Sequence, residues 1–342
     1  MNVTPLLDNI ETTCSVAKPS KSLSDKGFEE NFDENLYTLL LDDFEKFKKL
    51  SVEVSQALRF FADDEKLKEK GKVMQSCGFS LEFYEGRLVD ANFCRIRLCP
   101  MCQRRKSLKT YSDFVKLVAE LREYAFLHLT LTVPNCGFDE LSDTIAMMNK
   151  CSTKLFSLEP FKKAFHGIVR TLEVSYNSST IKFHPHFHCL VAVKPSYFKS
   201  RVYIKSDTIQ RLWSLLWKNR EENLRAKKWT ADYIDSLCLA DDERLQTHIV
   251  RADNGALPEI AKYAVKPLDF ECTLKERAKV LEALYSALNG KRMIYLSGVF
   301  KEASRKLKLA IDEDERELPS LDNKDTLHYY WNYRQARYEK GE

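Results

Sequence analysis

The sequence lacks any long apolar run. No stretch of the 342 residues approaches the roughly 18–20 apolar residues that a membrane-spanning helix needs. The N-terminus has no basic segment followed by an apolar run, so we expect no signal peptide and a cytoplasmic location. A Walker A pattern, the glycine-rich loop that holds nucleotide phosphates, is also missing, which excludes a nucleotide-driven motor of that class within the sequence.

Strong net charge is missing too. The chain carries 54 Lys and Arg against 50 Asp and Glu, a formal net charge of +4, which alone does not indicate a nucleic-acid partner. The local distribution says more, because no acidic residue occurs between Ala91 and Ser112. This stretch holds Arg95, Arg97, Arg104, Arg105, Lys106 and Lys109. We predict that it contacts phosphates; the alternative is a solvated helix face.

The ten cysteines are unevenly spaced. Four of them, Cys77, Cys94, Cys99 and Cys102, fall close together, and the last two form a Cys-x-x-Cys turn. Such a turn places two thiolates on one tetrahedral ion, and two further cysteines complete a closed structural zinc site. A redox pair and an unliganded cluster are the alternatives, although no thioredoxin-like pattern surrounds the turn.

Hydrophobic periodicity divides the chain into four regions. Residues 1–35 are polar and aperiodic, which predicts disorder. Residues 36–122 form a helical and cysteine-rich region, with helices over 36–70 and 107–123. Residues 123–305 are predicted to form strands that alternate with helices, and they are the candidate catalytic domain. The tail, residues 306–342, has no assignable pattern.

Two histidines on one predicted strand carry the most information. Alternate side chains of a strand share a face, so His186 and His188 point the same way. Phe187 and Cys189 point the other way, into a core. The strand therefore presents two imidazoles to a metal on one face and packs with the other.

A third ligand is available on the preceding strand. Residues 168–176, with a turn at 177–180, form a β-hairpin with the histidine strand, and Glu173 lies on the polar face. Two imidazoles and a carboxylate hold a divalent ion, Mn²⁺ or Mg²⁺, with open positions for a phosphate oxygen and water. His184 shares this face as a fourth ligand, a proton donor or a phosphate contact. Non-haem oxygenases and cupins use the same set, but they are jelly rolls without the long helices predicted here.

Two further segments complete the pattern. In the strand around 126–133, Thr130 and Thr132 lie on the polar face. Glu259 and Tyr263 are i and i+4 on one predicted helix, and the chain places Lys262 and Lys266 at the same spacing. A phenol is a poor nucleophile at neutral pH unless cations stabilise its phenolate, and these lysines supply positive charge. We predict that Tyr263 is a nucleophile; the alternative is a packed tyrosine.

In this order the segments resemble the HUH endonucleases, and more closely the rolling-circle replication initiator (Rep) proteins of small Gram-positive plasmids. The strand with Thr130 and Thr132 resembles their first motif, His184 to His188 the second, and Glu259 to Lys266 the third. Arg97 to Lys106 resembles their cysteine-rich segment. The resemblance runs from about residue 75 to 302.

The resemblance implies an α+β fold: an antiparallel HUH-type sheet, with the paired-histidine strand central and helices on the opposite face, plus a small zinc-binding segment. It implies that Tyr263 attacks a DNA phosphodiester, giving a 5′-phosphotyrosyl enzyme and a 3′-OH primer. Glu259 would then activate water for hydrolytic release.

The implied partner is plasmid origin DNA, single-stranded at the nick and bound through the cysteine-rich segment. A host helicase and DNA polymerase would act with the chain. The rivals are a single-tyrosine HUH transposase and a non-catalytic, zinc-dependent copy-control protein. The sequence does not give the oligomeric state.

Overall fold

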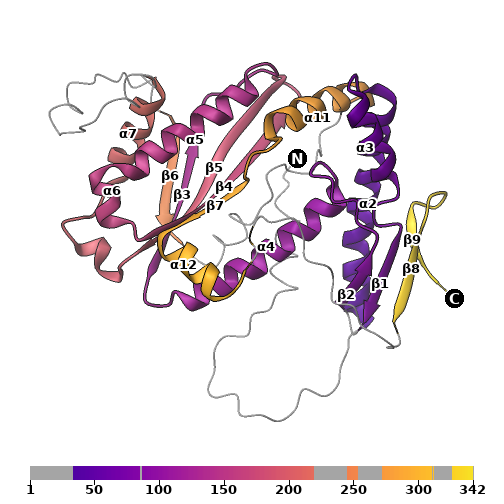
Figure 1. Cartoon of the computed structure of the whole chain (residues 1–342), viewed down its shortest axis with the longest axis horizontal. Helices are drawn as coiled ribbons and strands as arrows, with labels where there is room; N and C mark the ends of the chain where they lie inside the picture. Colours follow the sequence, from indigo (N-terminus) through magenta and orange to yellow (C-terminus); the bar gives the residue numbers. More distant parts are fainter. Residues whose placement is uncertain are drawn as a thin grey trace, which may run out of the picture.

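The computed structural model describes residues 34–84, 87–218, 245–252, 272–309, 311 and 326–341. Two antiparallel sheets organise these residues, a five-stranded sheet of order β6-β3-β5-β4-β7 and a four-stranded sheet of order β2-β1-β8-β9 (Figure 1). Within the described ranges, no helix is long and apolar enough to cross a membrane.

The five-stranded sheet places the paired-histidine strand at its centre, which confirms the predicted fold class. Its strands are β3 (Ala125–Thr132), β4 (Gly167–Asn177), β5 (Lys182–Val193), β6 (Thr247–Arg251) and β7 (Ile294–Ser297). β5 pairs with β3 on one side and with β4 on the other. A central strand is fixed by two hydrogen-bonded neighbours, so its side chains are held more firmly than those of an edge strand.

A tight turn sets the register of the β4–β5 hairpin. The side chain of Asn177 accepts a hydrogen bond from the Thr180 backbone N–H at 3.0 Å, as asparagine commonly does in turns. Ile181 then adopts a positive φ of 55° before β5 begins. The resulting register pairs Glu173 with His186 and Thr171 with His188.

One face of this sheet is covered by helices. Figure 1 draws α5 (Leu141–Ser157), α6 (Glu159–Ala164) and α7 (Ser206–Lys218) on the same side of the strands. The short helix η1 (Pro195–Lys199) follows β5 in the chain. Phe187 and Cys189 are buried beneath them. Trp213 of α7 is fully buried, and its indole N–H donates to the Thr132 carbonyl at 2.6 Å. The apolar side of the histidine strand thus forms the core that the alternation predicts.

The four-stranded sheet joins segments from opposite parts of the chain. β1 (Ser80–Tyr84) and β2 (Arg87–Ala91) form a hairpin, and β8 (Leu327–Asn332) pairs with β1 and with β9 (Arg337–Lys340). Phe83 of β1 packs edge-on against Phe44, at 6.2 Å between ring centroids. The tail, which has no assignable pattern in the sequence, therefore contributes two strands to the cysteine-rich unit.

The helices of this unit are α2 (Glu34–Phe61), α3 (Glu65–Gln75) and α4 (Pro100–Glu120). The predicted helix over 36–70 is two helices, because Asp64 caps a new helix by accepting from the Lys66 N–H at 2.7 Å. α4 begins well before the predicted residue 107, since Pro100 occupies its first turn, where a missing N–H costs nothing.

Helix α11 (Leu274–Leu288) connects the cysteine-rich unit to the five-stranded sheet, because it packs against α2 and also against α5, which covers the sheet. Arg277 of α11 pairs with Glu53 of α2 at 2.9 Å, and Glu282 accepts from the Asp63 backbone N–H at 2.6 Å. The guanidinium of Arg97 donates to the carbonyl of Leu288 at the last turn of α11. Helix α12 (Gly298–Lys306) follows β7 and packs Phe300 against Phe126 of β3.

Candidate active site and metal centres

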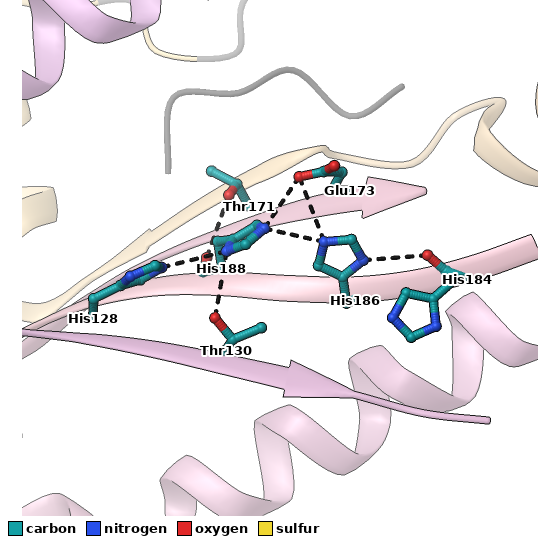
Figure 2. Close-up of polar contacts among 7 residues, drawn as sticks. All are labelled: His128, Thr130, Thr171, Glu173, His184, His186 and His188. Carbon is teal, nitrogen blue, oxygen red and sulfur yellow. Dashed lines mark hydrogen bonds and ion pairs between the residues drawn. The ribbon is translucent and has the colours of Figure 1, made fainter. Parts of the chain in front are cut away.

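Three side chains converge on the face of the β4–β5 hairpin opposite to the one that carries Phe187 and Cys189. Nε2 of His188 lies 3.1 Å from Nε2 of His186 and 3.1 Å from Oε2 of Glu173. The same carboxylate oxygen lies 3.5 Å from His186 Nε2. Figure 2 shows the two imidazoles on β5 and the carboxylate on β4 pointing toward one another. The predicted ligand set is therefore brought together by strand pairing alone.

The distances in this group suit a divalent ion. In an octahedral shell with bonds of about 2.1 Å, neighbouring ligand atoms lie about 3 Å apart, close to the three separations found here. Glu173 is 1% exposed, so its charge lies away from water, and a cation would compensate it. His186 and His188 are 9% and 8% exposed, so only a small part of each side chain reaches the surface. Imidazole and carboxylate together favour a transition-type divalent ion over calcium.

A further histidine, His128 on β3, contacts the ring nitrogen of His188 that points away from Glu173. Nε2 of His128 lies 3.3 Å from Nδ1 of His188, and the two rings are nearly parallel, 25° apart, with centroids at 5.5 Å. The hydroxyl of Thr130 lies 3.5 Å from the same Nδ1 (Figure 2). His128 shares the face of Thr130 because the two residues are two positions apart on one strand, and the sequence alone assigns His128 no role. Its position two residues before Thr130 is the signal that was available.

His184 and Thr132 lie outside the ligand group. Among the described residues, the group able to hold an ion here consists of Glu173, His186 and His188. The ring of His184 instead pairs through Nδ1 with Asn135 Oδ1 at 2.7 Å, while its backbone carbonyl lies 3.2 Å from His186 Nδ1. This geometry disfavours the fourth-ligand alternative and leaves the proton donor and the phosphate contact. The Thr132 hydroxyl donates to the Gln246 carbonyl at 2.7 Å, so it fixes the loop before β6.

The four clustered cysteines converge as a second group. Sγ of Cys102 lies 3.6 Å from that of Cys77 and 3.7 Å from that of Cys94. All four sulfur atoms, with Cys99, lie within 4.8 Å of one another. A tetrahedral zinc with Zn–S bonds of about 2.3 Å sets its sulfur atoms about 3.8 Å apart, so the spacing suits zinc. The thiols are free rather than paired in disulfides.

Polar groups contact two of the cysteine sulfur atoms, and the pKa of one thiol, Cys99, is lowered. The Cys94 backbone N–H donates to Cys77 Sγ at 3.3 Å, and the Ser51 hydroxyl lies 3.4 Å from Cys99 Sγ. Burial alone raises the pKa of Cys99, but hydrogen bonds from Cys102 and the other two thiols outweigh burial and hold that pKa well below its ordinary value. A two-cysteine redox pair does not need four converging thiols, so this arrangement favours a metal.

A fully buried lysine accompanies this group. Nζ of Lys48 donates to the carbonyls of Gln75 and Cys77 at 2.8 and 2.7 Å. Burial lowers the pKa of Lys48 to about 8, although the nearby thiols, Cys77 first, oppose this. The ammonium thereby places positive charge beside a cluster whose metal-bound form is anionic.

The basic segment makes several contacts within the chain. Arg104 pairs with Asp43 at 2.6 Å, and Lys109 with Asp113 at 3.5 Å. The guanidinium of Arg105 lies over the Phe93 ring, at 4.7 Å from its centroid. Arg97 caps α11, as described above. Arg95 is exposed, and Lys106 is half-buried.

The predicted nucleophile segment is not among the described residues. Glu259, Lys262, Tyr263 and Lys266 lie between β6 and α11, outside the described ranges. β6 ends at Arg251 and α11 begins at Leu274, after the capping box formed by Thr273 and Glu276. The described parts of the candidate site are therefore the group of Glu173, His186 and His188 and the cluster of four cysteines.

Comparison with known proteins points in one direction. The family model described as replication protein matches residues 85–339. A Protein rep of Streptococcus pneumoniae serotype 2 (strain D39 / NCTC 7466) is 31% identical over 82% of this chain and 84% of its own length. A Protein rep of Lentilactobacillus hilgardii is 31% identical over 85% of each chain. A Protein rep of Bacillus amyloliquefaciens is 31% identical over 75% of this chain and 78% of its own length. No solved structure matches the chain.

Proposed function

The chain belongs to the replication protein family, and from that membership we propose that it initiates rolling-circle replication of a plasmid by nicking one strand of the origin. The observation that carries this proposal is the group of Glu173, His186 and His188 on the central hairpin. Two imidazoles and a buried carboxylate 3.1–3.5 Å apart suit a catalytic metal better than they suit DNA binding alone.

The proposed nucleophile is Tyr263. Its phenolate oxygen would form a bond to phosphorus while the bond from phosphorus to the 3′ oxygen breaks. The departing oxygen takes a proton and becomes the 3′-OH that primes a DNA polymerase, and the 5′ phosphate stays on the tyrosine. A divalent ion held by Glu173, His186 and His188 would supply Lewis-acid polarisation of the phosphate. Lys262 and Lys266 would lower the cost of forming the phenolate.

Termination is assigned to Glu259. The nick transfers the 5′ end of the strand to Tyr263, and after one round of synthesis this tyrosine-linked strand must be released. Glu259 would accept a proton from water as the water oxygen attacks phosphorus, so the phosphotyrosyl bond breaks and Tyr263 is restored. One tyrosine and one carboxylate would thus perform a single transfer followed by hydrolysis.

The cysteine-rich unit is proposed to bind origin DNA. Zinc held by Cys77, Cys94, Cys99 and Cys102 would fix the start of α4, and the basic residues of that segment would contact phosphates. Arg97, Arg104 and Lys109 have partners within the chain, whereas Arg95 is exposed and is the stronger candidate. Because the sequence has no Walker A motif, a host helicase would unwind the duplex, in the cytoplasm.

A covalent-adduct assay tests the proposal. Wild-type protein with Mn²⁺ and a single-stranded origin oligonucleotide should give a denaturation-resistant protein–DNA adduct, and Tyr263→Phe should give none while still binding the origin. Origin binding without any adduct in the wild type would support the copy-control alternative. Transfer of the cleaved strand to unrelated DNA as readily as to an origin copy would support the transposase alternative.

A further inference from the structure

His188 uses both ring nitrogens. Its Nε2 faces the ligand group, 3.1 Å from Glu173 Oε2, while its Nδ1 lies 3.3 Å from Nε2 of His128. Resting on the proposed function, we infer that His128 is a positioning residue, which orients the metal ligand His188 and selects the tautomer able to bind the ion.

The chemistry of imidazole requires such a partner. A neutral histidine binds a metal through the nitrogen that has lost its proton, so the other nitrogen must carry the proton and donate it to an acceptor. For His188 the ligating nitrogen is Nε2, so Nδ1 carries the proton. His128 accepts it when its own proton lies on Nδ1 and its Nε2 lone pair faces His188.

The strand arrangement holds the two rings in this relation. Thr130 lies opposite His188 in the register of β3 and β5, and His128 lies opposite Leu190, so the histidines are diagonal neighbours on one face. Their rings are 25° from parallel, which lets the nitrogens meet near the ring edges. The Thr130 hydroxyl, at 3.5 Å, is the more distant acceptor.

The same geometry argues against His128 as a ligand itself. Its Nε2 contacts the nitrogen of His188 that points away from Glu173, so the width of one imidazole ring separates it from the proposed ion. Outer partners of this kind are typically worth about 10–100-fold in metal affinity, because without them the ligand ring rotates and loses its preferred tautomer.

Metal affinity without DNA tests the inference. We would measure Mn²⁺ binding to the full chain by electron paramagnetic resonance for the wild type, His128→Phe and His128→Gln. Phenylalanine keeps the ring but removes the acceptor, and should weaken Mn²⁺ binding by about 10–100-fold. Glutamine restores an acceptor oxygen near the place of Nε2, and should recover most of the affinity. His328→Phe, a half-exposed histidine on the other sheet, is the matched control and should bind as the wild type does.

The outcomes separate this inference from the proposed function. His128→Phe with wild-type affinity, or His128→Gln as weak as His128→Phe while both melt like the wild type, would overturn the role of His128 and leave nicking intact. A wild type that binds Mn²⁺ but forms no adduct would overturn nicking and leave His128 in place. A wild type that binds no Mn²⁺ would overturn both. In nicking assays, raising the Mn²⁺ concentration should restore the activity of His128→Phe, because this substitution weakens only the affinity for Mn²⁺.

Discussion

Oε2 of Glu173 lies 3.1 Å from Nε2 of His188, although the residue opposite Glu173 in the strand register is His186. The carboxylate therefore reaches diagonally across the hairpin and lies between both imidazoles. This position lets one oxygen complete a triangle with two nitrogens, whereas a carboxylate directed only at its opposite residue would leave His188 outside the group.

Glu173→Gln should abolish tight metal binding and slow nicking by at least about 100-fold, because the amide keeps the shape but removes the only charge of the ligand group. Both effects can be measured as the rate of nicking of a single-stranded origin oligonucleotide at increasing Mn²⁺ concentrations. His186→Ala should cost more than His184→Ala, since the His184 ring faces Asn135. Full activity of verified metal-free protein in chelator would refute the metal role.

Cys99→Ser should lose the structural metal. The purified wild type should carry about one zinc per chain by elemental analysis, and the variant much less, with a lower melting temperature. A closed zinc site contributes on the order of 10 kcal/mol to folding of its unit, so the loss should be large. Cys272→Ser is the control, because this half-buried cysteine is separate from the cluster. A variant that keeps both its zinc and its stability would contradict the assignment.

Glu259→Ala should leave nicking in place and impair release. Tyr263 still attacks in this variant, but the water that cleaves the phosphotyrosyl bond has lost its base. Time courses on origin substrates should show accumulating adduct, and plasmid templates should show products longer than one unit. If the variant instead nicks poorly and releases normally, Glu259 serves to orient Tyr263 and the termination scheme fails.

Much of the metal group is predictable from sequence because it is local. Glu173, His186 and His188 belong to one hairpin, and a period of two with a short turn fixes their shared face. The role of His128 is not predictable in this way, since it depends on the register between β3 and β5, which are separated by two helices and β4. The partners of Arg97 and Arg104 are equally distant: Leu288 and Asp43 belong to helices far away in the chain.

The C-terminal strands show the same limit. β8 pairs with β1, more than two hundred residues earlier in the sequence, and neither strand carries a local signal of its partner. Residues 327–340 alternate only weakly, so the sequence alone leaves them unassigned. Such pairing depends on contacts between distant segments, such as Phe83 of β1 with Phe44 of α2 and the Tyr338 N–H of β9 with the Glu45 carboxylate of α2.

Tyr338→Phe should loosen the cysteine-rich unit. The buried phenol of Tyr338 on β9 donates to the carbonyl of Gly78, next to Cys77 of the cysteine cluster, and its removal leaves that carbonyl without this bond. A loss of about 1–3 kcal/mol in unfolding free energy is expected, with faster zinc loss to a chelator. Tyr330→Phe, on a half-exposed tyrosine, should change neither quantity. If the two variants have the same unfolding free energy in denaturant, the Tyr338 hydrogen bond does not stabilise the cysteine-rich unit.

The pairing of β8 with β1 also imposes an order on synthesis. A chain leaving the ribosome can close the β4–β5 hairpin as soon as Val193 has emerged, but β1 must wait for nearly the whole chain before β8 reaches it. A translation product that stops before β8 would form the β4–β5 hairpin without the complete four-stranded sheet of the cysteine-rich unit. Completion of β8 and β9 thus closes the four-stranded sheet only after nearly all of the chain has been synthesised.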